Sequence, residues 1–571
     1  PIEPARMFGR TVLQWDKEDC AWMGLVKFDL LGLGMLSALS ISFDLISQHC
    51  GRFWTLASIP RNEPGVYDML CRGDSIGVFQ VESRAQIGVL PRLRPRCFYD
   101  LAVEIGLIRP GPVQGGAVHP YIRRRTGAEP VTYPHPLLEP VLERTLGIPL
   151  FQEQLMQMAT TVGNCTVADA DLLRRAMGSK RGVERINSLR TKLFEGMAAN
   201  GIDDDTAQGI YARIESFANF GFAESHALSF AGLVYTSAWI KLHYPAVFLA
   251  ALLRSQPMGF YSSATLVADA RRHGVVTRRP DVARSSVGAD LELLDACCEE
   301  LGSEELETGI DECLHDHDES EIGAFDPNRD DGDHRRDTHF AVRLGLSDVS
   351  GINIETATRI VEERERESFA SLDDLARRVD LSGEEVEALA LAGAFDDLVG
   401  SRRGALWQIG QINGVAPGQL DVQVVTQPPL LPEPTQMELL GDDLRATGIS
   451  TADHPVRQVR DALNRRGVVR VDRLDGVESG RRVEVAGVVT HRQRPGTAGG
   501  VTFLNLEDET GLLNVIVTPG AWRHYRRVAR TSRALVVRGI LERGDEGVMS
   551  LQADRLEALD LSVPTKSRDF R

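Results

Sequence analysis

Apolar residues recur at helical spacing through much of the first 255 positions of the chain. One such stripe consists of Leu36, Leu39, Phe43, Leu45 and Ile46. It predicts a helix that follows the short, strand-like apolar run 25–33. Similar periodicity marks 154–177 and 226–252, and Gly and Pro interrupt the pattern between these helices. We therefore expect a mostly helical segment over 56–255.

The last hundred residues follow a different pattern, in which apolar and polar positions alternate. The alternation is clearest in 482–489, 501–506, 512–517 and 534–540. Short strands of this kind, separated by Gly-containing turns, are typical of a small β structure of the OB-fold type, which we expect over 465–560. The fold class is therefore multidomain α+β.

Between these two parts, the sequence from Leu344 to Asn353 and the helix after it resemble a helix-hairpin-helix element, within an ordered segment over 339–413. Such a hairpin presents backbone N–H groups to a DNA phosphate and needs small residues there, which points to Gly351 and Asn353. Asn353 stands where a second glycine is usual, and Asn tolerates positive φ, so the turn can form. An ordinary helical hairpin is the alternative.

Charge is distributed unevenly along the chain, whose net charge is -17. Residues 290–336 contain 18 Asp or Glu and 3 Arg, a net of -15, so the remainder is near -2. The total therefore does not exclude nucleic-acid binding, which depends on local patches. We expect 290–336 to be a mobile loop within a linker and acidic insert over 256–338. A second, Pro- and Gln-rich linker is expected over 414–464.

Cellular location is indicated by the cysteines and by the apolar runs. Eight cysteines are scattered without CxxC spacing, which is typical of reduced thiols in the cytoplasm. No apolar run reaches the roughly 18 residues of a membrane helix, so we expect no membrane contact and a cytoplasmic protein. The chain begins with Pro1, not Met, in the middle of a pattern, and we expect an N-terminal part to be missing.

Candidate chemistry lies at the end of the run 25–33. Lys27 and Asp29 are two positions apart, so on a strand they point to the same face. A carboxylate beside an ammonium suits a metal-bound triphosphate, because the carboxylate can hold a divalent cation and the ammonium can meet a phosphate oxygen. A surface ion pair is the alternative from spacing alone.

The segment Leu25–Leu33 resembles the last catalytic palm strand of the bacterial C-family DNA polymerase III alpha subunits. Further segments resemble family motifs in the family's order: 77–84 (GVFQVESR), 108–112 (IRPGP), 147–154 (GIPLFQEQ), 173–180 (LRRAMGSK), 221–226 (GFAESH) and 243–246 (HYPA). Ala223 and Glu224 replace the usual Asn-Lys of housekeeping members. Together with 492–498 and 503–511, they resemble the error-prone, damage-induced branch that is associated with mutasomes and translesion synthesis.

The resemblance implies a domain order and an activity. It implies the end of a palm over 1–55, fingers over 56–255, the helix-hairpin-helix domain, the OB-fold domain and a tail over 561–571. The implied activity is DNA-directed DNA polymerisation in translesion synthesis and repair, with two Mg²⁺ ions assisting phosphoryl transfer. Asp29 would be one of three metal-binding carboxylates. We expect this chain alone to be inactive, since the other two belong to an upstream strand.

The resemblance also implies roles for cationic and polar side chains. Residues expected to bind the incoming nucleotide are Lys27, Arg109, Arg174, Arg175, Lys180, Ser225 and His226. Residues expected to bind DNA are Arg84, Arg123, Arg124, Gly351, Asn353, Arg492 and Arg494. Guanidinium groups suit phosphate contacts, although a solvated helix face is the alternative for Arg174 and Arg175.

The expected partners are primer-template DNA and dNTPs, with a sliding clamp and mutasome accessory proteins as further candidates. Residues 427–431 (QPPLL) loosely resemble a clamp-binding peptide, but they lack its aromatic anchor. The alternative function is a non-catalytic fragment that binds DNA and partner proteins and lacks a complete active site.

Overall fold

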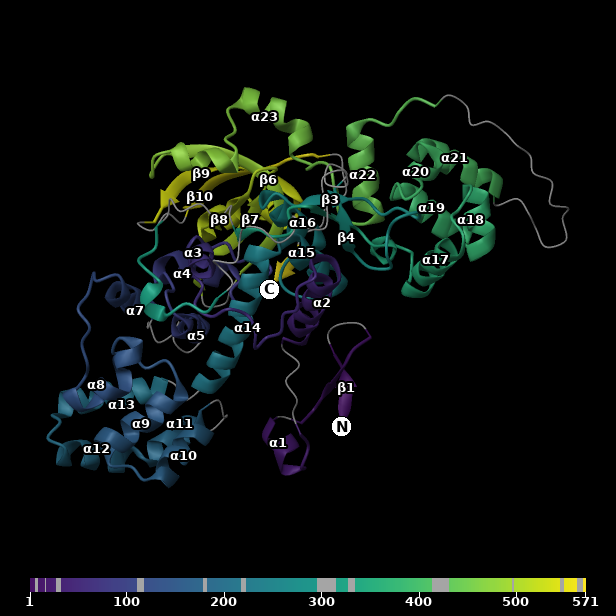
Figure 1. Ribbon diagram of the computed structural model, residues 1–571. Helices are drawn as coiled ribbons and strands as arrows, with labels where there is room; N and C mark the ends of the chain where they lie inside the picture. Colours follow the sequence, from purple (N-terminus) through teal and green to yellow (C-terminus); the bar gives the residue numbers. More distant parts are fainter. Residues whose placement is uncertain are drawn as a thin grey trace.

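The computed structural model describes residues 1–5, 9–15, 17–26, 32–109, 118–177, 182–216, 222–294, 315–326, 334–412, 431–494, 498–544, 549–561 and 568–570. Helices dominate its first two-thirds, and a β barrel stands near the C-terminal end (Figure 1). The predicted fold class, mostly helical with a C-terminal OB-fold, is confirmed.

A helical body surrounds two consecutive helices, α14 (Glu224–His243) and α15 (Pro245–Arg254). The second half of α14, from Val234 to His243, and α15 from Pro245 to Leu253 are buried on all sides, whereas the first turns of α14 are partly exposed. Trp239 and Tyr244 are among the largest fully buried side chains of this core. The other helices of the body are α2 (Leu33–Cys50), α3 (Pro64–Cys71), α4 (Arg84–Leu93), α5 (Phe98–Leu107), α7 (Val118–Arg125) and α16 (Ser263–Arg272).

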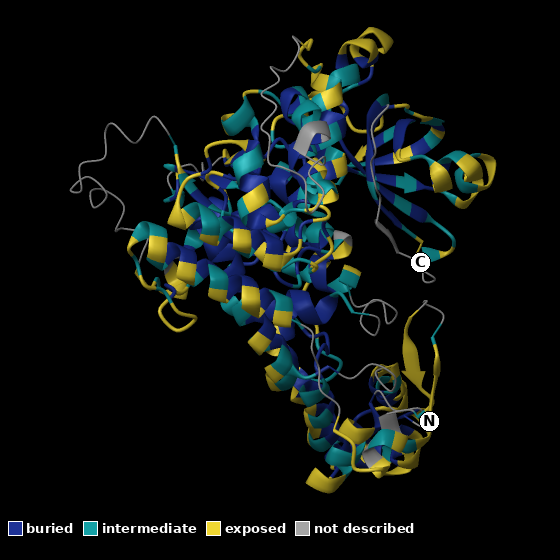
Figure 2. Ribbon diagram, turned by 90° about the vertical axis from the view of Figure 1, so that its right-hand side faces the viewer, coloured by how far each residue is buried: buried dark blue, intermediate teal, exposed yellow. Residues whose placement is uncertain are grey.

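A second helical cluster lies at the N-terminal end of α14 and has its own core, which includes Leu155, Leu193 and Ile210 (Figures 1 and 2). Its helices are α8 (Glu139–Leu142), α9 (Gln152–Gly163), α10 (Val167–Ala176), α11 (Gly182–Ser188), α12 (Arg190–Ala199) and α13 (Asp204–Ser216). A Cβ added at Gly196 would lie 2.0 Å from the Gly163 carbonyl oxygen. Glycine is therefore required where α12 crosses the end of α9.

The expected linker over 256–338 is wrong, because the described part of this segment is folded. It contains α16, β3 (Val276–Arg278) and β4 (Asp290–Leu293). The strand β5 (Phe340–Arg343) lies between them, parallel to β3 and antiparallel to β4. Long-range pairing of this kind leaves little trace in a local pattern, which explains the failed prediction.

The described flanks of the acidic insert are also packed, in contrast to the mobile loop expected for 290–336. Asp316 accepts a hydrogen bond from the Arg61 backbone N–H at 2.8 Å. Beyond the insert, Asp337 is fully buried and accepts bonds from the backbone N–H groups of Ala246 and Val247 at 2.6 and 3.1 Å. These contacts cap the start of α15. Residues 295–314 and 327–333 lie outside the described residues.

A third helical unit follows β5 and has a core that includes Ile360, Leu375 and Leu389. It consists of the 3₁₀ turn η8 (Leu346–Asp348), α17 (Ile354–Arg366), α18 (Leu372–Val379), α19 (Gly383–Leu391), α20 (Asp396–Val399) and α21 (Arg402–Ile412). The expected linker 414–464 also contains helical residues, since α22 (Gln436–Ala446) lies within it and α23 (Arg460–Arg466) begins in it. The Arg402 guanidinium donates to Asp443 on α22 at 2.8 Å.

The C-terminal strands close into a barrel. Its strands are β6 (Arg482–Gln493), β7 (Thr502–Glu507), β8 (Leu512–Val517), β9 (Ala534–Arg543) and β10 (Met549–Ala558). The sheet has no free edge along this circuit, because β6 pairs with both β7 and β9. The short strand β11 (Arg568–Phe570) adds to β6 in parallel. Two short helices, α24 (Pro519–His524) and α25 (Arg526–Thr531), connect β8 to β9.

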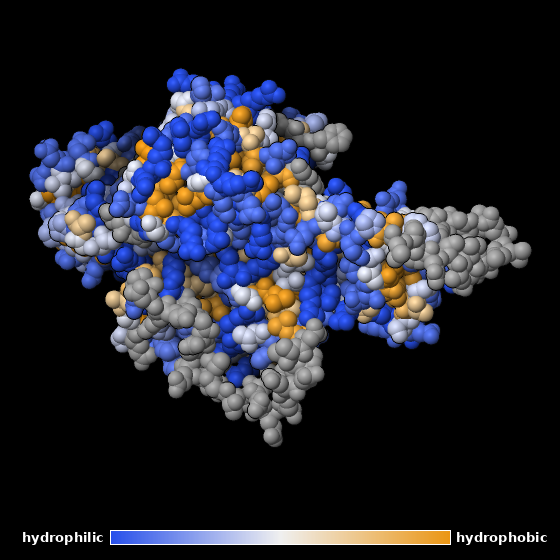
Figure 3. Space-filling model, turned by 90° about the horizontal axis from the view of Figure 1, so that it is seen from above, coloured by the Kyte–Doolittle hydropathy of each residue, from blue (hydrophilic) through white to orange (hydrophobic). Residues whose placement is uncertain are grey.

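The barrel is docked against the helical body. His491 on β6 bonds through Nε2 to the Phe260 carbonyl oxygen at 2.8 Å, and Thr265 on α16 donates to Glu507 on β7 at 3.3 Å. Seen from above, the surface is polar over most of its area, with smaller apolar patches (Figure 3).

The N-terminal strands β1 (Ile2–Pro4) and β2 (Thr11–Leu13) form an exposed hairpin, followed by α1 (Lys17–Trp22) (Figure 1). Within the described ranges, no helix is both long and apolar enough to cross a bilayer.

Candidate nucleotide and nucleic-acid site

The start of α14 brings together three of the residues predicted to bind the nucleotide. The Arg109 guanidinium lies 3.5 Å from the centre of the Phe222 ring. His226, the third residue of α14, packs against Phe222 and Phe230 at ring distances of 5.5 and 4.1 Å. Ser225 is exposed beside it. Partial burial lowers the pKa of Arg109 without removing its charge, so the site holds a fixed cation at the positive end of a 20-residue helix.

A polar network that sequence reasoning did not assign stands next to this site. Glu224 accepts a hydrogen bond from the Tyr99 hydroxyl at 2.7 Å, and its backbone N–H donates to Glu153 at 2.9 Å. The Arg144 guanidinium stacks on Tyr99 at 3.7 Å and approaches Glu224 at the same distance. Burial, followed by the bond to Glu224, raises the pKa of Tyr99. The negative charge of Glu224 is therefore partly compensated. In the sequence, Glu153 and Glu224 fall within two of the family motifs, and Glu224 belongs to the pair that replaces the usual Asn-Lys.

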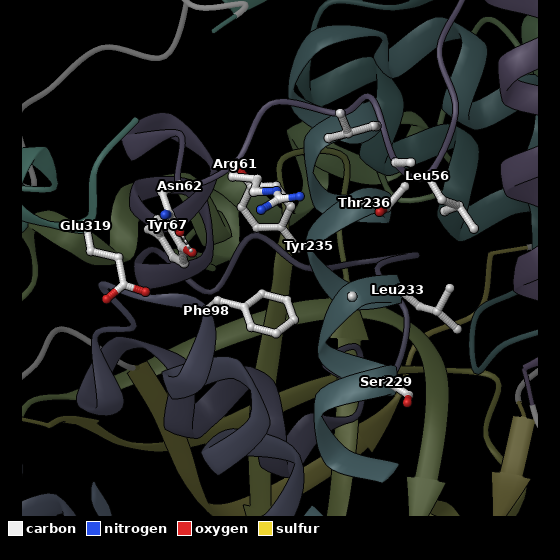
Figure 4. A pocket seen from close by; sticks show the side chains of 13 residues that line it. Leu56, Arg61, Asn62, Tyr67, Phe98, Ser229, Leu233, Tyr235, Thr236 and Glu319 are labelled. Carbon is white, nitrogen blue, oxygen red and sulfur yellow. Dashed lines mark hydrogen bonds between the residues drawn. The ribbon is translucent and has the colours of Figure 1, made fainter. Parts of the chain in front are cut away.

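A cavity of about 580 Å³ opens farther along α14. Figure 4 shows Phe98 and Tyr235 on its apolar walls, and Arg61 and Asn62 at its polar part. The Tyr67 hydroxyl donates to Asn62 at 3.2 Å, and the Tyr235 hydroxyl donates to the Pro60 carbonyl at 3.0 Å. Since most of its lining is apolar, the cavity suits a ring or an aliphatic group better than a phosphate.

Arg174 and Arg175 lie on a different element, in the last turn of α10. Both guanidiniums reach Asp171, at 2.8 and 2.5 Å, and both side chains are exposed. A shared carboxylate one turn earlier thus holds the two arginines on one side of the helix. Lys27, Asp29 and Lys180 lie outside the described residues, so their predicted roles stay predictions.

The arginines predicted to bind DNA differ in their exposure to solvent and in their hydrogen-bond partners. Arg123 is 57% exposed and pairs with Glu129 at 2.9 Å. Arg124 is only 10% exposed and donates to the carbonyl oxygens of Leu146 and Thr132 at 2.6 and 3.0 Å. Arg124 therefore ties α7 to the following loops in this structure. Arg84 begins α4, and its side chain lies outside what the structure describes.

The hairpin before α17 has the expected turn, but with different roles for its residues. Gly351 supplies the positive φ, at +97°. Asn353 has φ -87°, so the expectation that it would use positive φ is wrong. Its side chain instead accepts a hydrogen bond from the Thr356 N–H at 2.7 Å and caps α17. The contact of this turn with a DNA phosphate stays a prediction.

The two predicted residues of the barrel also have different environments. Arg492 is 7% exposed, and its Nε donates to the Ala529 carbonyl at 2.9 Å. This arginine holds α25 against the barrel and presents little surface to DNA. Arg494, at the exposed end of β6, lies 5.6 Å from the Trp522 ring.

Two groups of described side chains lie close enough to share a metal ion: Glu63 with His243 and His334, and Asp74 with Asp269 and His273. Neither group fits a Mg²⁺ pair, because Mg²⁺ prefers oxygen ligands and each group contains histidine. In the second group, the Lys241 ammonium lies 2.6 Å from Asp74 and 2.8 Å from Asp269. Both are better described as buried ion-pair networks. The residues predicted to bind the sliding clamp, 427–431, lie outside the described residues apart from Leu431.

Three models of known protein families match parts of this chain. A family model described as "Bacterial DNA polymerase III alpha subunit finger domain" matches residues 35–201. "Helix-hairpin-helix motif" matches 274–405, and "OB-fold nucleic acid binding domain" matches 483–559. The precise domain boundaries remain predictions.

Curated relatives match the chain along its whole length. It is 98% identical over 571 residues to the error-prone DNA polymerase of Cutibacterium acnes, covering all of this chain and 50% of that protein. It is 51% identical over 574 residues to the error-prone DNA polymerase of Mycolicibacterium paratuberculosis, covering 48% of it. It is 48% identical to that of Corynebacterium glutamicum, covering 50% of it. The chain thus spans about half the length of the curated relatives it matches.

Proposed function

Because this chain belongs to the bacterial error-prone DNA polymerases, a branch of the polymerase III alpha family, we propose that it supplies the nucleotide-binding fingers of such an enzyme. The proposed reaction adds a dNMP to a primer 3′ end during translesion synthesis and DNA repair in the cytoplasm. The proposed partners are primer-template DNA and dNTPs, with a sliding clamp and mutasome proteins as accessory partners.

The observation that supports this proposal is the position of Arg109 beside the start of α14. A triphosphate carries several negative charges, and three features there favour it: the guanidinium, the positive helix end and the exposed Ser225 hydroxyl. Stacking on Phe222 fixes the plane of the guanidinium before the ligand arrives, so less rotamer freedom is lost on binding. His226 is held between two aromatic rings and can add a further hydrogen bond.

The proposed metal ligand, Asp29, is separate from this observation. When bound, Mg²⁺ ions would activate the primer hydroxyl and neutralise charge on the phosphates. Asp29→Asn in the complete enzyme is expected to reduce extension to less than about a tenth, a barrier change above ~1.4 kcal/mol, while primer-template affinity is retained. If the variant extends primers at a rate comparable to that of the wild type, then Asp29 is not a ligand of the metal ions.

The experiment that tests the nucleotide site is steady-state primer extension by the complete enzyme with Arg109→Ala. We expect the KM for dNTP to rise about 10- to 100-fold, as a lost charge-assisted contact of ~1.5–3 kcal/mol requires, with primer-template affinity little changed. Arg190→Ala is the matched control, because Arg190 also stacks on aromatic rings, Phe194 and Tyr211, but in the second cluster. Equal effects of the two variants, or loss of DNA affinity alone, would refute the assignment.

A further inference from the structure

A second arginine stands beside the start of α14, on a different element from Arg109. Arg144 lies in the 3₁₀ turn η2 (Glu143–Thr145), and its side chain is 65% exposed. Its guanidinium lies over the Tyr99 ring, with 3.7 Å between the guanidinium carbon and the ring centre. A guanidinium that is stacked in this way has a fixed plane, while its N–H groups still face solvent. The end of the side chain is therefore both oriented and accessible.

A continuous row of aromatic rings connects Arg144 to Arg109. Tyr99 meets Phe151 edge to face at a ring distance of 6.4 Å, and Phe151 contacts Phe222 at 6.4 Å. Phe222 in turn carries the Arg109 guanidinium at 3.5 Å. Phe151 and Phe222 are buried in the core of the helical body. The same packing thus positions both cations, one at each end of the row.

The backbone that carries Arg144 is tied to the start of α14 through α9. The Gln154 side-chain amide donates to the Thr145 hydroxyl at 2.8 Å and anchors η2 on the first turn of α9. The Gln152 backbone N–H donates to the Phe222 carbonyl oxygen at 2.9 Å, just before α14 begins. The position of Arg144 relative to α14 is therefore set before a ligand arrives, and binding would cost little reordering of the backbone.

The contact between Arg144 and Glu224 leaves the guanidinium available. Their closest N–O separation is 3.7 Å, beyond hydrogen-bond range, and the same Glu224 oxygen already accepts from the Tyr99 hydroxyl at 2.7 Å. Across the described ranges, the Arg144 side chain donates no hydrogen bond to an acceptor of the protein. An exposed pair of this kind contributes little energy. A phosphate group would compete successfully for the guanidinium, because it carries more charge and matches its planar set of donors.

The acidic residues around the start of α14 make a second cation necessary for an anionic ligand. Glu224 is the first residue of the helix, and Glu153 accepts from its backbone N–H at 2.9 Å. With Arg109 as the single cation, these two carboxylates would leave a net negative charge that repels a triphosphate. Arg144 brings the formal charge of the four side chains to zero, and the positive end of the helix then favours an anion.

We propose that Arg144 is a second phosphate-binding residue of the nucleotide site, and that Tyr99 and Glu224 are positioning residues for it. The inference rests on the proposed function for the identity of the ligand, the triphosphate of an incoming dNTP. Before a nucleotide binds, the Tyr99 ring supports the guanidinium and Glu224 holds it near the start of α14. On binding, the N–H groups of Arg144 donate to phosphate oxygens while the stacking on Tyr99 is kept.

The test is steady-state primer extension by the complete enzyme with Arg144→Ala, made alone and together with Glu224→Gln. We expect the KM for dNTP to rise about tenfold in both backgrounds, with primer-template affinity changed by less than about twofold. A direct phosphate contact is lost whether or not Glu224 is charged, whereas an arginine that merely neutralised Glu224 would be dispensable in Glu224→Gln. An unchanged KM on adding Arg144→Ala to Glu224→Gln would therefore overturn the proposal.

Arg366→Ala is the matched control, because Arg366 is 70% exposed and pairs with one acid, Glu363, in the third helical unit. Its KM for dNTP should stay within about twofold of the wild-type value. Arg144→Lys keeps the charge but loses the stacked plane, so its KM should lie between those of wild type and Arg144→Ala. Tyr99→Phe keeps the ring and should have a nearly unchanged KM, whereas Tyr99→Leu should raise it. A wild-type KM in Tyr99→Leu would refute the positioning role of this ring.

Inorganic pyrophosphate tests the phosphate contact directly, since it has neither base nor sugar. Its Ki as an inhibitor competitive with dNTP should rise about tenfold in Arg144→Ala. An unchanged Ki, or a loss of primer-template affinity alone, would overturn the assignment. A wild-type KM in Arg144→Ala with a raised KM in Arg109→Ala would refute this inference and leave the proposed nucleotide site intact. Wild-type KM values in both variants would refute both.

Discussion

His243 bonds through Nε2 to both carboxylate oxygens of Glu63, at 2.9 and 2.8 Å, and both side chains are buried. The two residues are 180 positions apart in the sequence. Burial alone would raise the pKa of Glu63, but the hydrogen bonds from His243 and His334 outweigh it and lower the pKa from 4.5 to about 2. This pair joins the loop before α3 to the end of α14.

The first prediction concerns Glu63 and acid stability. A carboxylate whose folded pKa is depressed stabilises the fold above its unfolded pKa, near 4.5, and this stability is lost as pH falls toward 2. Glu63→Gln should therefore lower the free energy of unfolding at pH 7, on the order of 3 kcal/mol, and flatten its dependence on pH in this window. Urea unfolding at several pH values measures both. Glu139→Gln, at an exposed position, is the control, and equal behaviour of the two variants would contradict the prediction.

Glu507 is predicted to have the opposite pH dependence. It is buried where β7 meets α16, and burial raises its pKa from 4.5 to about 7. Its contribution to stability is complete below pH 4.5 and is lost as pH rises through 7, because the folded protein holds the proton more tightly. Between pH 5 and 8 the wild type should lose up to about 3 kcal/mol relative to Glu507→Gln. Thermal or urea unfolding of both proteins measures the difference, with the exposed Glu542→Gln as the control. Parallel curves for wild type and Glu507→Gln would show that the carboxyl is ionised throughout.

Arg123 and Arg124 are neighbours with different expected effects on stability. Arg124→Ala leaves the Leu146 and Thr132 carbonyls without their donor and should cost about 1–3 kcal/mol. Arg123→Ala removes an exposed ion pair and should change stability by less than about 1 kcal/mol. Urea unfolding distinguishes them. If Arg124→Ala weakens DNA binding without loss of stability, then Arg124 belongs to the DNA site as the sequence suggested.

Arg174→Ala and Arg175→Ala, made separately in the complete enzyme, should raise the KM for dNTP more than they weaken DNA binding. A lost contact to a triphosphate costs ~1.5–3 kcal/mol. Asp171 holds both guanidiniums in place, so Asp171→Ala should also raise the KM, but by less than either arginine variant. If the variants lose DNA affinity while the KM for dNTP is unchanged, then these arginines belong to the template-binding surface.

The sequence predicted elements whose periodicity is local. The run 512–517 is β8, and the apolar run 226–252 lies within α14 and α15. In the stripe 36–46, Leu39, Leu45 and Ile46 are buried, although Leu36 is 42% exposed. A helix or strand is visible in a pattern because its repeat is set within a few residues.

The sequence did not predict the structural roles of residues such as Asp337 and Arg492, because these roles depend on contacts between distant segments. Asp337 belongs to no helical or strand repeat in its own neighbourhood, yet it caps α15 some 90 residues earlier. Arg492 lies close to other basic residues in the sequence, which predicts a position on the surface. In the structure it is buried and donates to the carbonyl oxygens of Ala529 and Ser532. Such pairings bring together segments whose contact no local repeat encodes. A high density of acidic residues therefore proved a poor guide to order in the described flanks of 290–336.

The docking of the barrel through His491 and Thr265 has a consequence for how a template would be handled. The first contact fixes β6 to Phe260 and the second fixes β7 to α16, so two points of attachment oppose rotation of the barrel about either one. The distance between the barrel and the start of α14 would then be fixed. In the enzyme that we propose, DNA held by the barrel would therefore lie at a constant distance from the nucleotide site at α14.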